Sequence, residues 1–197
     1  MEIKNTITPA CKMIIFDMYN TLLQYKFIEA CAQKYFFSKE LDMLIRKEKD
    51  QSMLLIKATR FLKGLSLQEL LKIAVSIPLA DDALEIVGQL KKRGNVVGII
   101  SDSYQFVADS IKNKVGADFA VGNQLELIDG RATGGLIIPS IYYYRQESKC
   151  NHAICKTNVL LYMADKYNIP LKNCIAIGDR FTAECMLEQA GVAIKNW

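Results

Sequence analysis

At 197 residues, with 51% hydrophobic and 23% charged side chains, the chain has the size and composition of one globular domain, or of one domain with a modest insert. Its net charge of +4 is only mildly basic, and the absence of a dense Lys/Arg block excludes nucleic acid as an expected partner. No apolar stretch reaches the roughly 18 residues that a membrane-spanning helix needs, so no membrane partner is expected.

The start of the chain and its cysteines together predict a cytoplasmic protein. Residues 1–12, MEIKNTITPACK, contain neither an apolar signal region nor a cleavage site. Several of the cysteines lie in apolar runs, so reduced, buried thiols are expected; the six are at positions 11, 31, 150, 155, 174 and 185. Cys150, His152 and Cys155 would offer three ligands to a metal, but this reading is not favoured because a second pair of ligands is missing.

The first third of the chain predicts one strand followed by helices. Residues 13–16, MIIF, form a short apolar run typical of a buried strand, and Asp17 follows it directly. From Tyr25 to Val75 the apolar residues recur at spacings of three and four, which predicts helices, with a turn at Gly64 and an end at Pro78.

The rest of the chain predicts alternating strands and helices. Asp81 and Asp82 begin a helix that closes at residues 91–94, and alternation around Asp129-Gly130 indicates a hairpin. Further strands are expected at 96–100, 118–121, 173–178 and 192–194, and further helices at 104–115, 154–167 and 182–190.

This alternation predicts an α/β fold with a Rossmann-like parallel sheet covered on both faces. The expected domains are an α/β core made of residues 1–22 and 79–197, and a helical cap of residues 23–78 inserted after the first strand.

Polar residues follow three of the predicted strands. Asp17 follows the first, residues 101–103 (Ser-Asp-Ser) follow the second, and Gly178-Asp179 follow the fourth. Each alone is typical of a helix N-cap, but ligands of open α/β sheets bind at the carboxyl ends of the strands. Several such ends with complementary chemistry therefore predict a binding site.

The chemistry of these residues fits phosphoryl transfer to a carboxylate. Asp17 would attack phosphorus and form an acyl-phosphate, and Asp17 with Asp179 would bind Mg²⁺. Thr21 and Ser101 would bind the phosphate oxygens, and Lys156, at the start of its helix, is a candidate to offset the negative charge.

At these spacings the motifs resemble those of the haloacid dehalogenase superfamily, closest to its phosphoserine phosphatase branch. Residues 16–23, FDMYNTLL, resemble the first motif, DxDx(T/V), and residues 94–104, GNVVGIISDSY, resemble the second. Residues 119–134 resemble the stretch that follows in phosphoserine phosphatases, and residues 156–179 reproduce the interval from the family's lysine to its fourth-motif aspartate. The similarity covers nearly the whole chain.

The resemblance implies a phosphatase-like hydrolase that uses Mg²⁺ and acts on a small phosphorylated metabolite. It makes Asp17 the nucleophile, with the Tyr19 carbonyl and Asp179 beside it on Mg²⁺, and the helical insert a cap that selects substrates. The remaining residues of the predicted site bind phosphate or substrate: Thr21, Ser101, Asp102, Lys156, and Lys26 for a second anionic group.

Three positions depart from the family pattern. Tyr19 stands where phosphatases have a second aspartate as general acid and base, and a phenol with a pKa near 10 is a poor substitute. The fourth motif reads GDRFTAE instead of GDGxND, so its second acid is replaced by Ala183, with Glu184 as the alternative metal ligand. The Glu and Arg that read phosphoserine correspond to Lys26 and Ala58, with Arg60 nearby, so phosphoserine is not the expected substrate.

Two alternatives stay open beside a Mg²⁺-dependent phosphohydrolase. A catalytically impaired member would bind phosphorylated ligands or act as a regulatory protein. A 2-haloacid dehalogenase would carry a tyrosine at the position of Tyr19, because halide leaves without a proton, but those enzymes lack the Gly178-Asp179 pair and do not use Mg²⁺.

Overall fold

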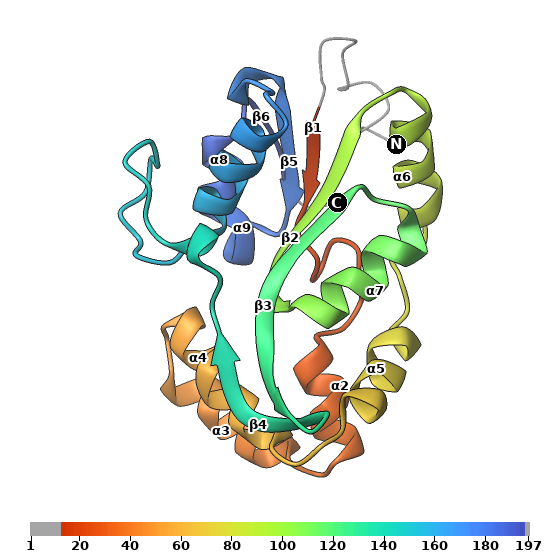
Figure 1. Ribbon diagram of the computed structural model, residues 1–197, viewed down its shortest axis with the longest axis vertical. Helices are drawn as coiled ribbons and strands as arrows, with labels where there is room; N and C mark the ends of the chain where they lie inside the picture. Colours follow the sequence, from red (N-terminus) through yellow and green to blue (C-terminus); the bar gives the residue numbers. More distant parts are fainter. Residues whose placement is uncertain (1–12, 196–197) are drawn as a thin grey trace.

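A six-stranded sheet of order β4-β3-β2-β1-β5-β6 forms the centre of the computed structural model, which describes residues 13–195 (Figure 1). Neighbouring strands are parallel except for the antiparallel pair β3–β4. This arrangement confirms the expected α/β fold, whereas the expectations for residues 1–12 lie outside the described residues. The strands are β1 (Met13–Phe16), β2 (Val96–Tyr104), β3 (Phe119–Ile128), β4 (Arg131–Ile137), β5 (Cys174–Gly178) and β6 (Val192–Lys195).

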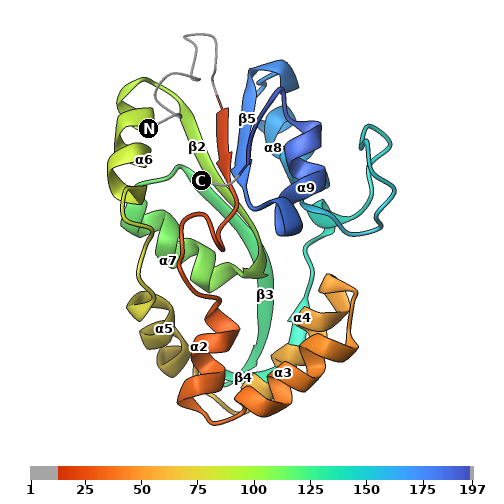
Figure 2. The same ribbon diagram turned by 180° about the vertical axis from the view of Figure 1, so that it is seen from behind.

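Helices cover both faces of this sheet (Figures 1 and 2). Alternate residues of β1 explain why: Ile14 and Phe16 pack into one apolar cluster, while Met13 and Ile15 pack into another on the opposite face. Because both faces are buried, the strand is apolar at every position. One face is covered by α6 (Ala83–Lys92) and α7 (Gln105–Val115), the other by α8 (Lys156–Lys166) and α9 (Arg180–Gln189).

The segment predicted as a helical insert is helical between β1 and α6. Its helices are α2 (Phe27–Lys34), α3 (Ser38–Lys47), α4 (Gln51–Thr59) and α5 (Leu67–Ser76), with a 3₁₀ turn η1 (Arg60–Leu62). Gly64 makes the predicted turn with a φ of 86°, and Ser66 with Glu69 forms a capping box at the start of α5. Figure 1 shows these helices gathered at the carboxyl end of the parallel strands.

Two strands are longer than the sequence predicts. β2 continues past Ile100 to Tyr104, and β3 continues past Val121 to Ile128. For β3 the structure joins two predicted pieces, the strand at 118–121 and the first arm of the hairpin, because the strand leaves the sheet core yet keeps its hydrogen bonds by pairing with β4. The turn that joins them is the predicted one: Asp129 and Gly130 both have positive φ, 49° and 73°, as a two-residue hairpin requires.

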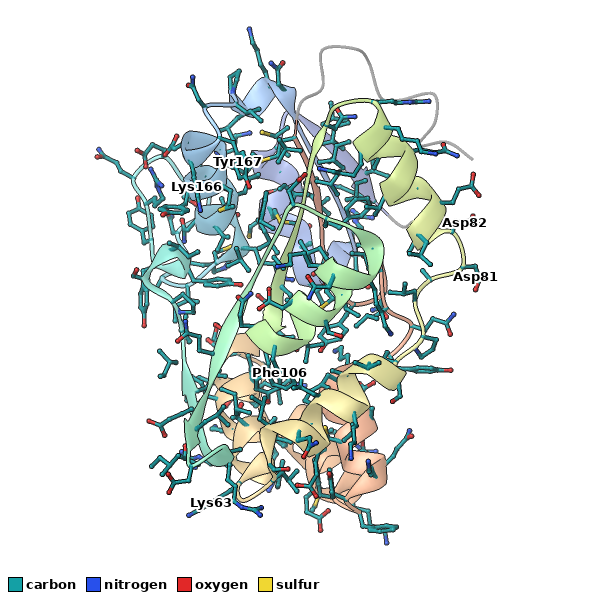
Figure 3. All side chains as sticks on the ribbon, turned by 45° about the vertical axis from the view of Figure 1, so that its right-hand side comes forward. Lys63, Asp81, Asp82, Phe106, Lys166 and Tyr167 are labelled. Atoms are coloured by element: carbon teal, nitrogen blue, oxygen red, sulfur yellow. The ribbon has the colours of Figure 1, made fainter. Side chains whose placement is uncertain are left out.

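The β3–β4 hairpin is bonded to the insert although the two are distant in the sequence. Gly64 N donates to Ala132 O at 2.8 Å, and Leu67 N donates to Gly130 O at 2.9 Å. Phe106 of α7 adds an aromatic contact, because its ring lies 5.2 Å from that of Phe27, at the start of α2 (Figure 3). The insert is therefore held against the sheet region at two places.

Two further 3₁₀ turns, η2 (Ser140–Tyr142) and η3 (Leu171–Asn173), flank α8. Among residues 13–195, no helix has both the length and the apolar character needed to cross a membrane.

Candidate active site

Asp17 lies at the centre of the sheet, where β1 ends between β2 and β5. Phe16 is in register with Ile99 on one side and Ile177 on the other, and Asp17 N donates to Ile177 O at 2.8 Å. A side chain at position 178 would place its Cβ 2.9 Å from the Cβ of Asp17, so only glycine allows this approach. As a result, Asp17 is 1% exposed.

Both carboxylate oxygens of Asp17 accept hydrogen bonds. Oδ1 accepts from Met18 N at 2.8 Å and from Lys156 Nζ at 2.9 Å. Oδ2 accepts from the Thr182 hydroxyl at 2.7 Å. These donors fix the orientation of a buried carboxylate and stabilise its negative charge.

Lys156 is the buried cation of the site. As the first residue of α8 it is 4% exposed, and its Nζ contacts Asp17, Asp102 at 2.9 Å and the carbonyl of Thr182 at 2.8 Å. Burial alone would lower the pKa of Lys156, but the charges of Asp102 and Asp17 outweigh it and hold this pKa above its ordinary value. Lys156 therefore stays protonated at neutral pH.

Thr182 is a residue that the sequence reasoning missed. The fourth motif of the family predicts a second acid at position 183, with Glu184 as the alternative. In the structure, the first turn of α9 instead points the hydroxyl of Thr182 at Asp17. Ala183 itself is buried beside Gly178. The start of the helix immediately after Asp179 was the signal that would have placed residue 182 beside Asp17.

Asp179 caps the N-terminus of α9. Its Oδ1 accepts from Phe181 N at 2.6 Å, and its Oδ2 accepts from Asn20 Nδ2 at 2.9 Å. Partial burial acts to raise the pKa of Asp179, but these hydrogen bonds and the charges of Lys26 and Lys156 lower it overall. Asp179 is therefore an anion close to Asp17.

The oxygens of Asp17, Asp179 and the Tyr19 carbonyl fit a magnesium ion by their chemistry. They come from two neighbouring strand ends. The described hydrogen bonds place one donor on Asp17 Oδ2, one on each Asp179 oxygen and one on the Tyr19 carbonyl, which accepts from Thr21 Oγ1 at 3.3 Å, so each of these oxygens keeps a lone pair. Mg²⁺ prefers such hard ligands and completes its shell with water and phosphate. Glu184 is exposed on α9, and none of the described hydrogen bonds or ion pairs joins it to these residues, so its assignment to the metal stays a prediction.

The hydroxyl of Tyr19 forms hydrogen bonds to other residues of the protein. It lies 2.5 Å from Ser103 Oγ and accepts from Phe27 N at 3.2 Å. Burial, which outweighs these bonds, raises the pKa of Tyr19 further above its ordinary value. Tyr19 therefore joins the first motif to the end of β2 and to the start of α2, and it is a worse proton donor than an ordinary tyrosine.

The end of β2 supplies two further predicted residues. Ser101 is fully buried; its Oγ accepts from Ser103 N at 3.1 Å, which leaves its own proton available to a ligand, and its carbonyl accepts from Tyr142 at 2.6 Å. Asp102 has about half of its side chain exposed. Partial burial raises the pKa of Asp102. The positive charge of Lys156 lowers this pKa, but the nearby negative charge of Asp17 raises it, and the net shift is upward.

A pocket lies between these strand ends and the helical insert. Its polar wall contains five of the predicted residues (Asp17, Tyr19, Lys26, Asp102 and Lys156) together with Thr182. The predicted residues Thr21, Ser101, Asp179 and Glu184 are not among the side chains that line it. Its opposite wall is mostly apolar and comes from the insert: Ile28, Leu41, Ile45, Leu54, Leu55 and Ala58.

Comparison with known proteins shows the family to which the chain belongs. A haloacid dehalogenase-like hydrolase profile matches residues 6–181, which is most of the chain. The chain belongs to this family. As a haloacid dehalogenase-like hydrolase it falls in the phosphoserine phosphatase-like branch, as its motifs predict, and its fold is that of the branch.

Relatives of this family member include phosphoserine phosphatases. It is 30% identical to the one from Archaeoglobus fulgidus, over 98% of this chain but 55% of that protein, and 27% identical to the one from Methanocaldococcus jannaschii, over 93% and 84%. The chain also spans 44% of the relative from Streptomyces coelicolor, so it covers about half the length of two of these curated relatives. A substrate-bound phosphoserine phosphatase complex superposes with a TM-score of 0.79 at 26% identity, covering 94% of this chain and 85% of the other.

Proposed function

We propose that this chain is a Mg²⁺-dependent phosphomonoesterase that acts through an aspartyl-phosphate on a small phosphorylated metabolite. The observation that carries the proposal is the carboxylate of Asp17, buried at the base of a pocket and oriented by Lys156 and Thr182. The relatives named as phosphoserine phosphatases support the same class of reaction. We place the activity in the cytoplasm, because Cys31 and Cys174 are buried in the apolar core, as is usual for reduced cysteines.

In the first step a carboxylate oxygen of Asp17 forms a bond to phosphorus while the bond from phosphorus to the ester oxygen breaks. The departing oxygen takes a proton and leaves as an alcohol or phenol. In the second step water attacks the acyl-phosphate, gives a proton to a base, and releases inorganic phosphate with the carboxylate restored. Lys156 and the Ser101 hydroxyl stabilise the phosphoryl oxygens in both steps.

Asp17, Asp179 and the Tyr19 carbonyl would hold Mg²⁺. The ion, when bound, supplies positive charge that offsets the charge of the phosphoryl group. Thr182 and Asn20 orient the two carboxylates, and the lowered pKa of Asp179 keeps that residue anionic for the ion.

We assign proton transfer to Asp102 in place of the aspartate that is missing at Tyr19. Asp102 lines the pocket at the end of β2, and its raised pKa makes it easier to protonate than an ordinary aspartate, as a group that accepts and returns a proton requires. Its ion pair with Lys156 places it beside the nucleophile. The Tyr19 hydroxyl, in contrast, is occupied by Ser103 and Phe27.

The insert, residues 23–78, acts as a cap that selects the leaving group. The part of the pocket wall that the insert forms is apolar around Ala58. Arg60 is exposed and does not line the pocket. A phosphoserine carboxylate would therefore lack a cationic partner at position 58. The favoured substrates are phosphate esters with an apolar leaving group, while Lys26, which also lines the pocket, accepts a second anionic group where one is present.

One observation favours a second candidate, a catalytically impaired member that binds phosphorylated ligands. The position of the usual proton donor holds Tyr19, and its hydroxyl is bonded within the protein. Such a protein would bind phosphate and Mg²⁺ without turnover of any ester.

Turnover of an aryl phosphate separates these candidates. The wild-type chain should release phosphate from 4-nitrophenyl phosphate with Mg²⁺ and lose this activity with a chelator. Asp17→Asn should abolish it, whereas the control Asp81→Asn should not, because Asp81, labelled in Figure 3, is exposed and does not line the pocket. No turnover alongside measurable phosphate binding would favour the impaired protein, and halide release from a 2-haloacid in chelator would favour a dehalogenase.

Asp102→Asn tests the assigned proton donor. An alkoxide leaves far less readily than a phenolate, so turnover of an alkyl phosphate should fall at least tenfold more than turnover of 4-nitrophenyl phosphate. Equal losses on both substrates would remove Asp102 from proton transfer.

A further inference from the structure

Four side chains with metal-binding atoms gather outside the pocket. The ligand atoms of Cys150, His152, Cys155 and Cys185 all lie within 4.8 Å of one another, with 3.4 Å between Cys185 Sγ and His152 Nδ1. In the part of the chain that the structure describes, this is the one group of three or more His, Cys, Asp or Glu side chains so arranged. The sequence showed three of these ligands but not that α9 brings the fourth.

The spacing of these atoms fits tetrahedral coordination. With metal–sulfur bonds of about 2.3 Å and metal–nitrogen bonds of about 2.0 Å, neighbouring ligand atoms lie roughly 3.5–3.8 Å apart. The distance from Cys185 Sγ to His152 Nδ1 already has this length. The remaining distances need only small side-chain adjustments, because none exceeds 4.8 Å.

The backbone holds the ligands in place. Cys155, the residue before α8, donates its N–H to Tyr142 O at 2.9 Å, and Tyr144 N donates to Ala153 O at 2.8 Å, which closes the loop that carries Cys150 and His152. The loop is also bonded to the end of α9, since Lys149 N donates to Gln189 Oε1 at 2.8 Å. The loop and α9 are therefore joined by contacts that do not involve the four ligands.

We propose that these four residues bind one Zn²⁺ in a closed, structural Cys₃His site. Three thiolates and an imidazole form a ligand set that Zn²⁺ prefers, and four protein ligands leave no position for a substrate. Hydroxyls next to the thiols would orient them: Ser148 Oγ lies 3.4 Å from Cys150 Sγ, and Thr157 Oγ1 lies 3.4 Å from Cys155 Sγ.

The proposed zinc site lies next to residues that bind Asp17. Cys155 directly precedes Lys156, and Cys185 lies three residues after Thr182 on α9. Lys156 and Thr182 are the side chains that bind the carboxylate of Asp17. A zinc ion would therefore join the start of α8 to the middle of α9 and keep both partners of Asp17 at their distances.

Zinc content tests the site without any assay of turnover. The reduced chain, dialysed in excess Mg²⁺ to occupy the carboxylates, should retain one zinc per chain by elemental analysis. Cys185→Ser and His152→Gln should weaken zinc binding at least tenfold, and His152 is exposed, so that variant keeps the fold. The matched control Cys174→Ala, which removes a thiol from β5, should retain the ion.

Cobalt distinguishes this site from the carboxylates of the pocket. Co²⁺ bound by the four residues should give tetrahedral ligand-field bands and thiolate-to-cobalt charge transfer, in wild type and in Asp17→Asn alike. Chelation should lower the Tm of wild type but not that of Cys185→Ser. Wild type without zinc, Cys185→Ser with undiminished affinity, or cobalt spectra without the thiolate band would each overturn the proposal.

Discussion

Asp17 combines a full negative charge with almost complete burial, and the residues around it explain how the fold tolerates this. A buried carboxylate is costly unless cations and hydrogen-bond donors accompany it. Lys156 and Thr182 provide them, and removing either would leave a charge without its partner. Tyr19 contributes differently, because it secures the loop after β1 through Ser103 and Phe27.

Replacing Tyr19 with phenylalanine tests this structural role. The variant loses two hydrogen bonds but keeps the ring, so the free energy of unfolding should fall by about 1–2 kcal/mol. Turnover of an alkyl phosphate, whose leaving group needs a proton, should stay within about threefold of wild type, because the hydroxyl transfers no proton to the leaving group. Tyr25→Phe, at a largely exposed position, is the control for thermal melts and kinetics. A drop in turnover of a hundredfold or more would instead make Tyr19 the acid.

The raised pKa of Asp102 predicts a pH-dependent cost to stability. The unfolded chain ionises this residue near its ordinary pKa of about 3.9, before the folded chain does, so wild type loses stability as pH rises from there through the folded pKa. Asp102→Asn does not share this loss. Its Tm relative to wild type should increase from about pH 4 towards neutral pH and then stay constant. A difference that does not change with pH would contradict the raised pKa.

At the scale of elements, the ends of strands and the starts of helices build the site. The polar residues at the ends of β1, β2 and β5 were visible in the sequence, because each group follows an apolar run. The role of Thr182 was not, since it depends on where α9 begins and how its first turn faces β1. The end of β2 was also hidden, because pairing with β3 extends it past Ile100 through the polar residues to Tyr104.

The apolar wall from α4 predicts how substrate choice would change. Ala58→Arg combined with Lys26→Glu places in the pocket the two groups that the family's phosphoserine readers carry. Turnover of phosphoserine, as kcat/KM, should rise at least tenfold, while that of 4-nitrophenyl phosphate should change less.

Ala58→Met with the same Lys26→Glu change is the control, because it adds similar length without charge. An equal rise in both double variants would show that charge at position 58 does not select the substrate.

At the scale of the whole molecule, long-range contacts determine the features that could not be predicted from the sequence. The sheet, its flanking helices and the helical insert followed from periodicity, since each local pattern agrees with the fold. The bonds between the β3–β4 hairpin and the insert did not, because Gly64 and Ala132 are far apart in the sequence. The approach of Cys185 to Cys150 was hidden for the same reason.

Trapping the covalent intermediate is the most direct test of the proposed chemistry. Wild-type chain mixed with a ³²P-labelled aryl phosphate and Mg²⁺, then quenched in acid, should carry label that peptide mapping assigns to Asp17, and Asp17→Asn should carry none. Turnover without label on Asp17, or label that persists in Asp17→Asn, would contradict catalysis through this residue.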